Sequence, residues 1–342
     1  MIDLKKIVRP NILELKPYSS ARDEYSSSKG IFLDANENPY GSLNRYPDPY
    51  QRAVKGKLAR LKNIATENIF IGNGSDEVID LAFRIFCTPG KDKALSFAPT
   101  YGMYKVSTGI NAVDLEEIPL NEDFQIDTNE LATYFSEENY KLLFICSPNN
   151  PTGNSMDLSS IEFILQNFKG IVFVDEAYID FSEQKSCIEL VQKYNNLIVS
   201  QTFSKAWGLA GARVGIAYAN AEIITLYNKV KPPYNVSTLN QEAILNAMNN
   251  YETYQENLKA IKTQKSNMEQ QLHEIDFIKK IYPSDANFLL LKLDNATEVY
   301  KKLMEQNIIV RNRSKQIPNT LRITIGTPEE NQKLIDTLKN IA

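Results

Sequence analysis

Short apolar runs rich in Val, Ile, Leu and Phe alternate with longer helical stretches between about residues 68 and 220. The seven runs cover residues 68–73, 94–98, 112–118, 141–147, 171–175, 197–200 and 214–217. Several are continuously apolar, which is typical of strands buried on both faces. Because the connections between the runs are long enough for helices, we expect a large, mostly parallel seven-stranded sheet with helices on both sides.

The pattern changes after about residue 220, where a long charged stretch over residues 240–274 predicts a helix. Three further apolar runs predict strands at residues 288–293, 308–310 and 321–325. Helical segments are expected between and after these strands, at residues 297–306 and 329–341. Together these elements predict a smaller α/β domain that follows the large one.

The first 45 residues contain three prolines and little periodicity, which predicts an arm with one short helix. We therefore divide the chain into three parts. Residues 1–45 form the arm and part of the small domain, residues 46–225 the large domain, and residues 226–342 the small C-terminal domain.

Composition narrows the class of protein. The 342 residues include 38 basic and 42 acidic ones, for a net charge of −4, and no basic block suggests a nucleic-acid surface. No apolar run approaches the roughly 18 residues of a membrane helix. The first residues lack the apolar core of a signal peptide. We expect a soluble, cytoplasmic protein that binds neither nucleic acid nor membrane.

Cysteine and histidine usage argues against a metal site. Cys87, Cys146 and Cys187 lie far apart and match neither a disulfide framework nor a CxxC pair, so we expect reduced, mostly buried thiols. The only histidine, His273, lies in a charged helical stretch. A His-based metal site or a Ser-His-Asp triad is therefore not expected, and we predict no bound metal.

The segment around Lys205 carries the clearest chemical signal. Lys205 follows the apolar run at residues 197–200, Thr202 and Ser204 stand close before it, and Arg213 comes eight residues later, beyond two glycines. This grouping suits an amine that loses its proton and forms an imine with a phosphorylated aldehyde, while the hydroxyls and the arginine hold the phosphate. The alternative is a solvated surface charge, the usual role of a lysine near a strand end.

A glycine-containing turn, with Gly74 followed by Ser75 and Asp76, lies between a predicted strand and an amphipathic helix. Glycine lets the backbone approach a ligand closely, and free N–H groups at the start of a helix favour an anion such as phosphate. The simpler interpretation is that Ser75 or Asp76 only caps the helix.

Two other predicted strands end in polar residues. Asn150 lies in a proline-rich turn after residues 141–147, at the edge where open α/β sheets bind ligands. Asp175 ends a fully apolar strand, where a carboxylate is costly unless it is paired or hydrogen-bonded. A protonated pyridine nitrogen would pair with it, and Tyr178 could reach the ring hydroxyl. The alternatives are that Asn150 only forms part of an Asn-Pro turn and that Asp175 only caps a helix.

Together these residues supply the groups that pyridoxal phosphate requires. Lys205 would bind the cofactor covalently, and burial should lower its pKa from about 10.4, leaving a base for the substrate proton. Asp175 would keep the ring nitrogen protonated, so that the ring accepts electrons. Asn150 and Tyr178 would hydrogen-bond the ring oxygen, and Tyr101 could stack on the ring. The predicted phosphate ligands are the Gly74 turn with the amides of Ser75 and Asp76, together with Thr202, Ser204 and Arg213.

On these motifs the chain resembles the fold-type I PLP-dependent aminotransferases, and within them the histidinol-phosphate aminotransferases. The resemblance covers nearly the whole chain, from residues 16–22 to residues 321–327. Besides the cofactor motifs it rests on residues 33–39, residues 45–48, and residues 309–311 with Arg322. It implies a large PLP-binding domain, a smaller α/β domain, and transamination of L-histidinol phosphate with 2-oxoglutarate in histidine biosynthesis.

The resemblance also implies an obligatory homodimer with shared active sites, in which Tyr46 reaches the phosphate of the neighbouring subunit's cofactor. It places Tyr18, Asn150, Arg311 and Arg322 at the substrate. Two arginines suit a dianionic phosphate or a carboxylate, since each guanidinium binds bidentately. The sequence departs from the family in having Ser75 where alanine is common and a slightly short stretch from Arg311 to Arg322.

Other functions stay open. An aromatic amino acid aminotransferase or a decarboxylase of phosphorylated threonine could use the same scaffold, because the bond broken at Cα depends on its orientation to the ring. A non-catalytic cofactor-sensing domain of a transcription regulator would need a helix-turn-helix module. The arm before residue 45 is too short and too rich in proline to hold one.

Overall fold

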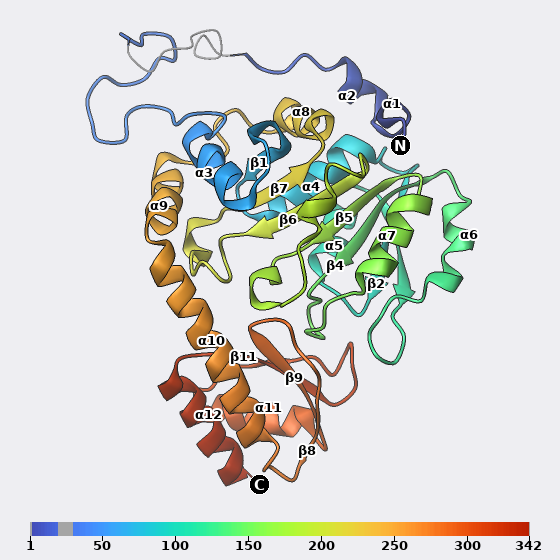
Figure 1. Ribbon diagram of the computed structural model, residues 1–342, viewed down its shortest axis with the longest axis vertical. Coiled ribbons are helices and arrows are strands. Elements are labelled where there is room, and N and C mark those ends of the chain that lie inside the picture. The colour runs from blue at the N-terminus through green and yellow to red at the C-terminus, as the bar shows by residue number, and fades with distance from the viewer. Residues whose placement is uncertain (1, 20–29, 342) are drawn as a thin grey trace.

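A computed structural model describes residues 2–19 and 30–341 and contains a larger and a smaller sheet (Figure 1). The strands of the larger sheet are β1 (Ile69–Gly72), β2 (Lys93–Ala98), β3 (Asp114–Pro119), β4 (Tyr140–Cys146), β5 (Ile171–Asp175), β6 (Leu197–Thr202) and β7 (Gly215–Ala219). Their order is β1-β7-β6-β5-β4-β2-β3, and β7 runs antiparallel to the other six strands. The predicted mostly parallel seven-stranded sheet is confirmed.

Apolar residues cover both faces of this sheet, which explains why its central strands are continuously hydrophobic. In β5, Val172 and Val174 belong to the core on one face, whereas Ile171 and Phe173 belong to the core on the other. Helices α3, α7 and α9 pack on the first face, and α1, α4, α5 and α8 on the second. The sheet therefore lies between two helical layers, with its strand ends free to form a site.

The helices have the following bounds. They are α1 (Leu4–Ile7), α2 (Pro10–Glu14), α3 (Arg52–Lys62), α4 (Ser75–Phe86), α5 (Met103–Ile110), α6 (Ala132–Phe135), α7 (Leu158–Asn167), α8 (Ala221–Val230), α9 (Thr238–Asn249), α10 (Tyr251–Leu272), α11 (Ala296–Glu305) and α12 (Pro328–Ile341). The sequence predicts one short helix in the arm, and the described residues of the arm, 2–19 and 30–45, contain two, α1 and α2. The division of the chain at residues 45 and 225 stays a prediction.

The smaller sheet is antiparallel, with the order β10-β11-β9-β8. Its strands are β8 (Ile278–Ile281), β9 (Phe288–Leu293), β10 (Arg311–Asn312) and β11 (Thr320–Thr324). Helices α10, α11 and α12 bury its apolar face. The strand predicted at residues 308–310 begins later, at Arg311, and β8 was not predicted, because Lys279 and Lys280 interrupt its apolar pattern.

The helix predicted over residues 240–274 is two helices, which meet at Asn250. α10 then runs from the larger to the smaller sheet (Figure 1). Near its start, Tyr254 stacks on Trp207 with ring centroids 4.0 Å apart, and near its end Leu272 lies in the core of the smaller sheet. α10 therefore connects the turn that carries Lys205 to the smaller sheet.

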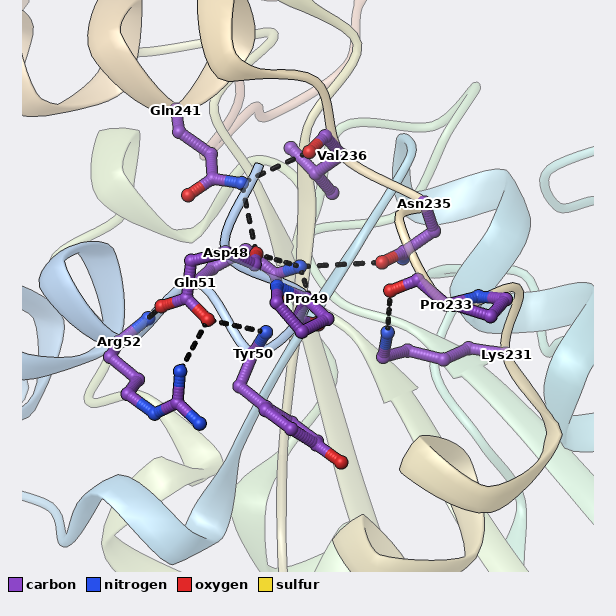
Figure 2. Close-up of polar contacts among 10 residues, drawn as sticks. All are labelled: Asp48, Pro49, Tyr50, Gln51, Arg52, Lys231, Pro233, Asn235, Val236 and Gln241. Atoms are coloured by element: carbon purple, nitrogen blue, oxygen red, sulfur yellow. Dashed lines mark hydrogen bonds and ion pairs between the residues drawn. The ribbon is translucent and has the colours of Figure 1, made fainter. Parts of the chain in front are cut away.

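A hydrogen-bond network fixes the point where the arm joins the large domain (Figure 2). The Gln51 amide donates to the Pro49 carbonyl oxygen at 3.0 Å and to Asn235 Oδ1 at 3.4 Å. Asn235 Nδ2 in turn donates to Glu77 Oε2 at 2.8 Å, and that carboxylate accepts from the N–H of Asn73 at 2.5 Å. The base of the arm is thus linked through Asn235 to the glycine-containing turn before α4.

Candidate active site

The carboxyl ends of three adjacent strands meet at one pocket. Asn150 lies in the turn after β4, Asp175 is the last residue of β5, and Lys205 lies in the turn after β6. The pocket has an empty volume of about 490 Å³. Its lining residues are Ser75, Asp76, Tyr101, Cys146, Asn150, Asp175, Ala177, Tyr178, Thr202, Ser204, Lys205 and Arg213. This is the edge where open α/β sheets bind ligands.

Gly74 and the start of α4 form an anion-binding corner of the pocket. Gly74 has a φ of 81°, and a Cβ at this position would lie 2.8 Å from Arg213 Nη2, so the turn requires glycine. No side chain caps α4, so the first N–H groups of the helix, from Ser75 and Asp76, face the corner without a side-chain acceptor. With the Arg213 guanidinium, they can hold a phosphate.

Lys205 lies in a turn that its neighbours hold in place. The Ser204 N–H donates to Thr202 Oγ1 at 3.1 Å, and the Thr202 hydroxyl donates to the Val214 carbonyl oxygen at 3.2 Å. Burial, and next to it the positive charge of Arg322, lowers the pKa of Lys205. A lowered pKa increases the neutral fraction of the amine, the form that attacks a carbonyl or takes a proton.

Asp175 is a buried carboxylate, only 3% exposed. Its Oδ2 accepts from the Tyr104 hydroxyl at 2.9 Å, and its Oδ1 accepts from the Ala177 N–H at 3.2 Å. Burial raises its pKa to about 6, against the opposing effect of the Tyr104 hydrogen bond. Within the described part of the chain it forms no ion pair. A buried carboxylate of this kind fits a ligand that brings its own cation, such as a protonated pyridine nitrogen.

We expect Tyr104→Phe to weaken cofactor binding about 10-fold, because it removes a hydrogen bond to the charged form of Asp175 and so raises the pKa of that carboxyl. The measurement is the pH dependence of the pyridoxal phosphate dissociation constant, by absorbance titration of the apoprotein. The loss should be larger near pH 6 than at pH 8, where Asp175 is ionised in both proteins.

Tyr140→Phe is the matched control for this substitution. Tyr140 is also a buried tyrosine whose hydroxyl donates to a carboxylate, that of Glu116, but it does not line the pocket. Cofactor affinity should be unchanged in this variant. Equal affinities for the wild type and Tyr104→Phe across the pH range would show that Tyr104 does not tune Asp175.

Arginines of the smaller sheet reach the same pocket. An Nη1–H of Arg322 donates to Asn150 Oδ1, and Arg313 Nη2 lies 3.4 Å from the same oxygen. The Arg322 guanidinium carbon lies over the Phe288 ring, 5.2 Å from its centroid, and Tyr178 packs edge-on against that ring. Arg311 pairs in register with Arg322 across β10 and β11, and its side chain is exposed.

Tyr18 and Tyr46 lie outside the lining of the pocket. Tyr18 follows α2 in an extended segment and is 69% exposed. Tyr46 is half-exposed and stacks on Tyr234, with ring centroids 4.3 Å apart. Their roles at the substrate and at a neighbouring cofactor stay predictions, as do the roles of the residues that line the pocket.

Two side chains at the site were not singled out in the sequence. Tyr104 lies in α5, and its ring packs edge-on against that of Tyr101, which comes just before the helix, with centroids 5.6 Å apart. Arg313 comes two residues after Arg311, a spacing that places both on one side of an extended chain. The closeness of each residue to a predicted site residue is visible in the sequence. It does not show which member of each pair contacts the pocket.

The described residues contain no group of three or more His, Cys, Asp or Glu side chains placed to hold a metal ion. All three cysteines are free and buried. In the part of the chain that the structure covers, no helix has the length and apolarity needed to span a bilayer.

The donor set fits pyridoxal phosphate. Asp175 matches a protonated ring nitrogen, the start of α4 with Arg213 matches the phosphate, and Lys205 is the amine with a lowered pKa. The geometry thus agrees with the cofactor that the sequence implies.

Comparisons with known proteins point the same way. The profile of the family Aminotransferase class I and II matches residues 27–338. A histidinol-phosphate aminotransferase of Christiangramia forsetii is 50% identical over 344 residues, covering 99% of this chain and 98% of the relative. The crystal structure of the histidinol-phosphate aminotransferase from Clostridium acetobutylicum has a TM-score of 0.80 at 24% identity, covering 87% of this chain and 91% of that one.

A second solved structure carries the cofactor. Histidinol-phosphate aminotransferase from Sinorhizobium meliloti, in complex with pyridoxal-5′-phosphate, has a TM-score of 0.78 at 21% identity and covers 90% of each chain. At these identities the two crystal structures establish the shared fold.

Proposed function

The chain belongs to the aminotransferase class I and II family, and from this membership we propose that it transfers the amino group of L-histidinol phosphate to 2-oxoglutarate. The products are imidazole-acetol phosphate and L-glutamate, a step of histidine biosynthesis. The observation that carries this assignment is the 50% identity to a histidinol-phosphate aminotransferase over 99% of the chain. The cluster of arginines at the pocket agrees with a substrate that has an anionic end.

The cofactor is pyridoxal 5′-phosphate, which supplies an aldehyde that bonds amines and a ring that accepts electrons from the substrate's Cα–H bond. Lys205 would hold it covalently, and the start of α4 with Arg213, Thr202 and Ser204 would bind its phosphate. Asp175 would keep the ring nitrogen protonated. The pocket geometry and the resemblance to the family support these roles.

Lys205 also moves the proton. Its lowered pKa increases the neutral fraction of its amine, and in that form Nζ would take the proton from the substrate's Cα and later return it. Tyr178 limits the space on one side of that amine, since Lys205 Nζ lies 5.4 Å from the Tyr178 ring centroid. Tyr101 would stack on the cofactor ring, and Asn150 and Tyr178 would hydrogen-bond the ring oxygen, since all three side chains line the pocket.

The test is a single-turnover absorbance measurement on the purified enzyme without keto acid. L-histidinol phosphate, L-phenylalanine and O-phospho-L-threonine are added separately, and released carbon dioxide is assayed. Rapid loss of the visible band of the bound cofactor with histidinol phosphate alone, restored by 2-oxoglutarate, is the expected result. Equal loss with phenylalanine would make the enzyme an aromatic aminotransferase, and carbon dioxide from phosphothreonine would make it a decarboxylase.

A homodimer with shared active sites is part of the proposal, as is a cytoplasmic location. The arm exposes large apolar side chains, with Ile31 91%, Leu33 88% and Tyr40 83% exposed, an unusual surface for a monomer. The network around Gln51 and Asn235 fixes the base of this arm (Figure 2), and Tyr46 stacks on Tyr234, the residue before Asn235. A second subunit would cover the arm, and Tyr46 would reach the phosphate of that subunit's cofactor.

Mixing two inactive variants tests whether Tyr46 acts across the dimer. After unfolding and refolding together, Lys205→Ala and Tyr46→Ala should regain about a quarter of wild-type activity. Half of the dimers are then mixed, and each mixed dimer has one site with Lys205 and an intact Tyr46. Steady-state rates measured after refolding give the answer. If Tyr46 acts within its own subunit, mixing restores nothing beyond the activity of the Tyr46→Ala protein.

A further inference from the structure

Arg313 lies beside the pocket, and among the described residues it has no charged partner. It follows β10, and its Nη2 approaches Asn150 Oδ1 to 3.4 Å, the same oxygen that accepts from Arg322. The Nε atoms of Arg313 and Arg322 are both buried and have no hydrogen-bond partner. Buried N–H groups of arginine cost free energy when they are unpaired, so both side chains are set to bind a further acceptor.

The charges around Arg313 are all positive. Arg322 and Arg311 both lower the pKa of Arg313, and the charge of Arg322 also lowers the pKa of Lys205. Across the residues that the structure describes, no carboxylate lies within 4 Å of any of the three arginines. Burial and the two neighbouring arginines lower the pKa of Arg313 to about 10. A cluster of like charges without a carboxylate is stabilised when an anion binds.

Two substrates must use this cluster in turn, and they carry different anions. A phosphate monoester carries close to two charges and three oxygens at neutral pH, whereas a carboxylate carries one charge and two oxygens. One guanidinium satisfies a carboxylate through two parallel hydrogen bonds. The third oxygen and the second charge of a phosphate need another donor, and Arg313 is the cation that lies next to Arg322 at Asn150.

We propose that Arg313 is a specificity-determining residue that, together with Arg322, selects the phosphate of the amino donor over the carboxylate of glutamate. This inference rests on the proposed function and adds a residue to it. Arg322 serves both substrates, and Arg313 serves the phosphate. The sequence resemblance points instead to Arg311 beside Arg322, but in the structure Arg311 is exposed and Arg313 reaches Asn150.

The test compares Arg313→Gln and Arg313→Lys with the wild-type holoenzyme. Dissociation constants for L-histidinol phosphate and L-glutamate come from absorbance titration, and that for inorganic phosphate comes from calorimetry. We expect Arg313→Gln to raise the constants for histidinol phosphate and inorganic phosphate roughly 10- to 100-fold, and that for glutamate less than about 3-fold. The dissociation constants of Arg313→Lys should lie between those of the wild type and Arg313→Gln, because lysine keeps the positive charge but cannot form two parallel hydrogen bonds.

Lys315→Gln is the matched control, since it removes one positive charge from the same turn at an exposed position. It should leave all three constants unchanged. Equal losses for phosphate and carboxylate ligands in both Arg313 variants, or no loss for either, would overturn the proposal. A wild-type enzyme that does not bind histidinol phosphate would instead overturn the proposed function, and the calorimetric arm with inorganic phosphate would still decide the role of Arg313.

Discussion

Replacing Lys205 with alanine should lower the rate of transamination by at least about 10⁴-fold and leave the fold intact. Lys205 has two tasks in the proposed mechanism, since its amine holds the cofactor and moves the substrate proton, and general base catalysis alone accounts for about 10²- to 10⁴-fold. The side chain lies in a turn whose hydrogen bonds come from Thr202 and Ser204, so truncating it should not disturb the backbone. The visible absorption of the bound cofactor should shift toward that of the free aldehyde.

Lys265→Ala is the control. Lys265 is also a lysine whose pKa is lowered first by burial, and its Nζ donates to the Ser284 carbonyl oxygen away from the pocket. This variant should keep activity within about 3-fold of the wild type, so that burial of a lysine is separated from catalysis. Substantial activity in Lys205→Ala, with no small amine added to replace the side chain, would remove Lys205 from the mechanism.

Replacing Asp175 with asparagine should lower kcat by about 10²- to 10⁴-fold. The asparagine keeps the shape of the side chain but removes the charge that holds the ring nitrogen in its protonated form, so the ring becomes a weaker electron acceptor. The measurement is kcat with saturating cofactor and both substrates, together with the dissociation constant of pyridoxal phosphate. Unchanged kcat would contradict the assignment of Asp175 to the ring nitrogen.

Although Asp175→Asn should lower kcat, it should make the apoprotein more stable at pH 8. Burial raises the pKa of Asp175 from 3.8 to about 6, so the folded chain binds more protons than the unfolded chain between these values. Stability from this group therefore falls as the pH rises through that window. Above that window, the buried ionised carboxylate destabilises the wild-type apoprotein by about 3 kcal/mol. The asparagine variant avoids this cost but loses one of the two hydrogen bonds, which destabilises it by about 1 kcal/mol.

Urea unfolding of the two apoproteins measures this effect. At pH 8, Asp175→Asn should be more stable by roughly 2 kcal/mol, and at pH 4 most of that difference should be gone. A variant that is less stable than the wild type at pH 8 would show that the ionised carboxylate is well solvated in the apoprotein. The ionised carboxylate of Asp175 thus lowers the stability of the apoprotein while it increases the rate of catalysis.

The large sheet was predictable because its central strands are continuously apolar and end in polar turns. β5 illustrates this, since Ile171 to Val174 are fully buried and Asp175 follows directly. The small sheet was harder to predict. β8 is half-exposed and contains two lysines, and its pairing with β9 depends on tertiary contacts rather than on its own pattern. The break between α9 and α10 at Asn250 likewise lies within a polar stretch that fits a continuous helix.

The lining of the pocket was predictable to the extent that its residues lie in turns at strand ends, as Asn150 and Lys205 do. The contact of Tyr104 with Asp175 was not predictable, because Tyr104 reaches Asp175 from a helix on one face of the sheet. The hydrogen bond joins residues 71 positions apart. The position of Arg313 was not predictable either, because the turn after β10 decides whether Arg311 or Arg313 contacts Asn150. Both contacts depend on how distant elements pack, which a local pattern does not contain.

The position of Trp207 provides an optical probe. It is the only tryptophan of the chain, it lies two residues after Lys205, and it stacks on Tyr254 of α10. All tryptophan emission therefore comes from one place, beside the cofactor turn and the helix that leads to the arginines of the smaller sheet. Cofactor loading should quench this emission by energy transfer, and a shift of α10 on substrate binding should change its wavelength, so both events can be followed in real time without a label.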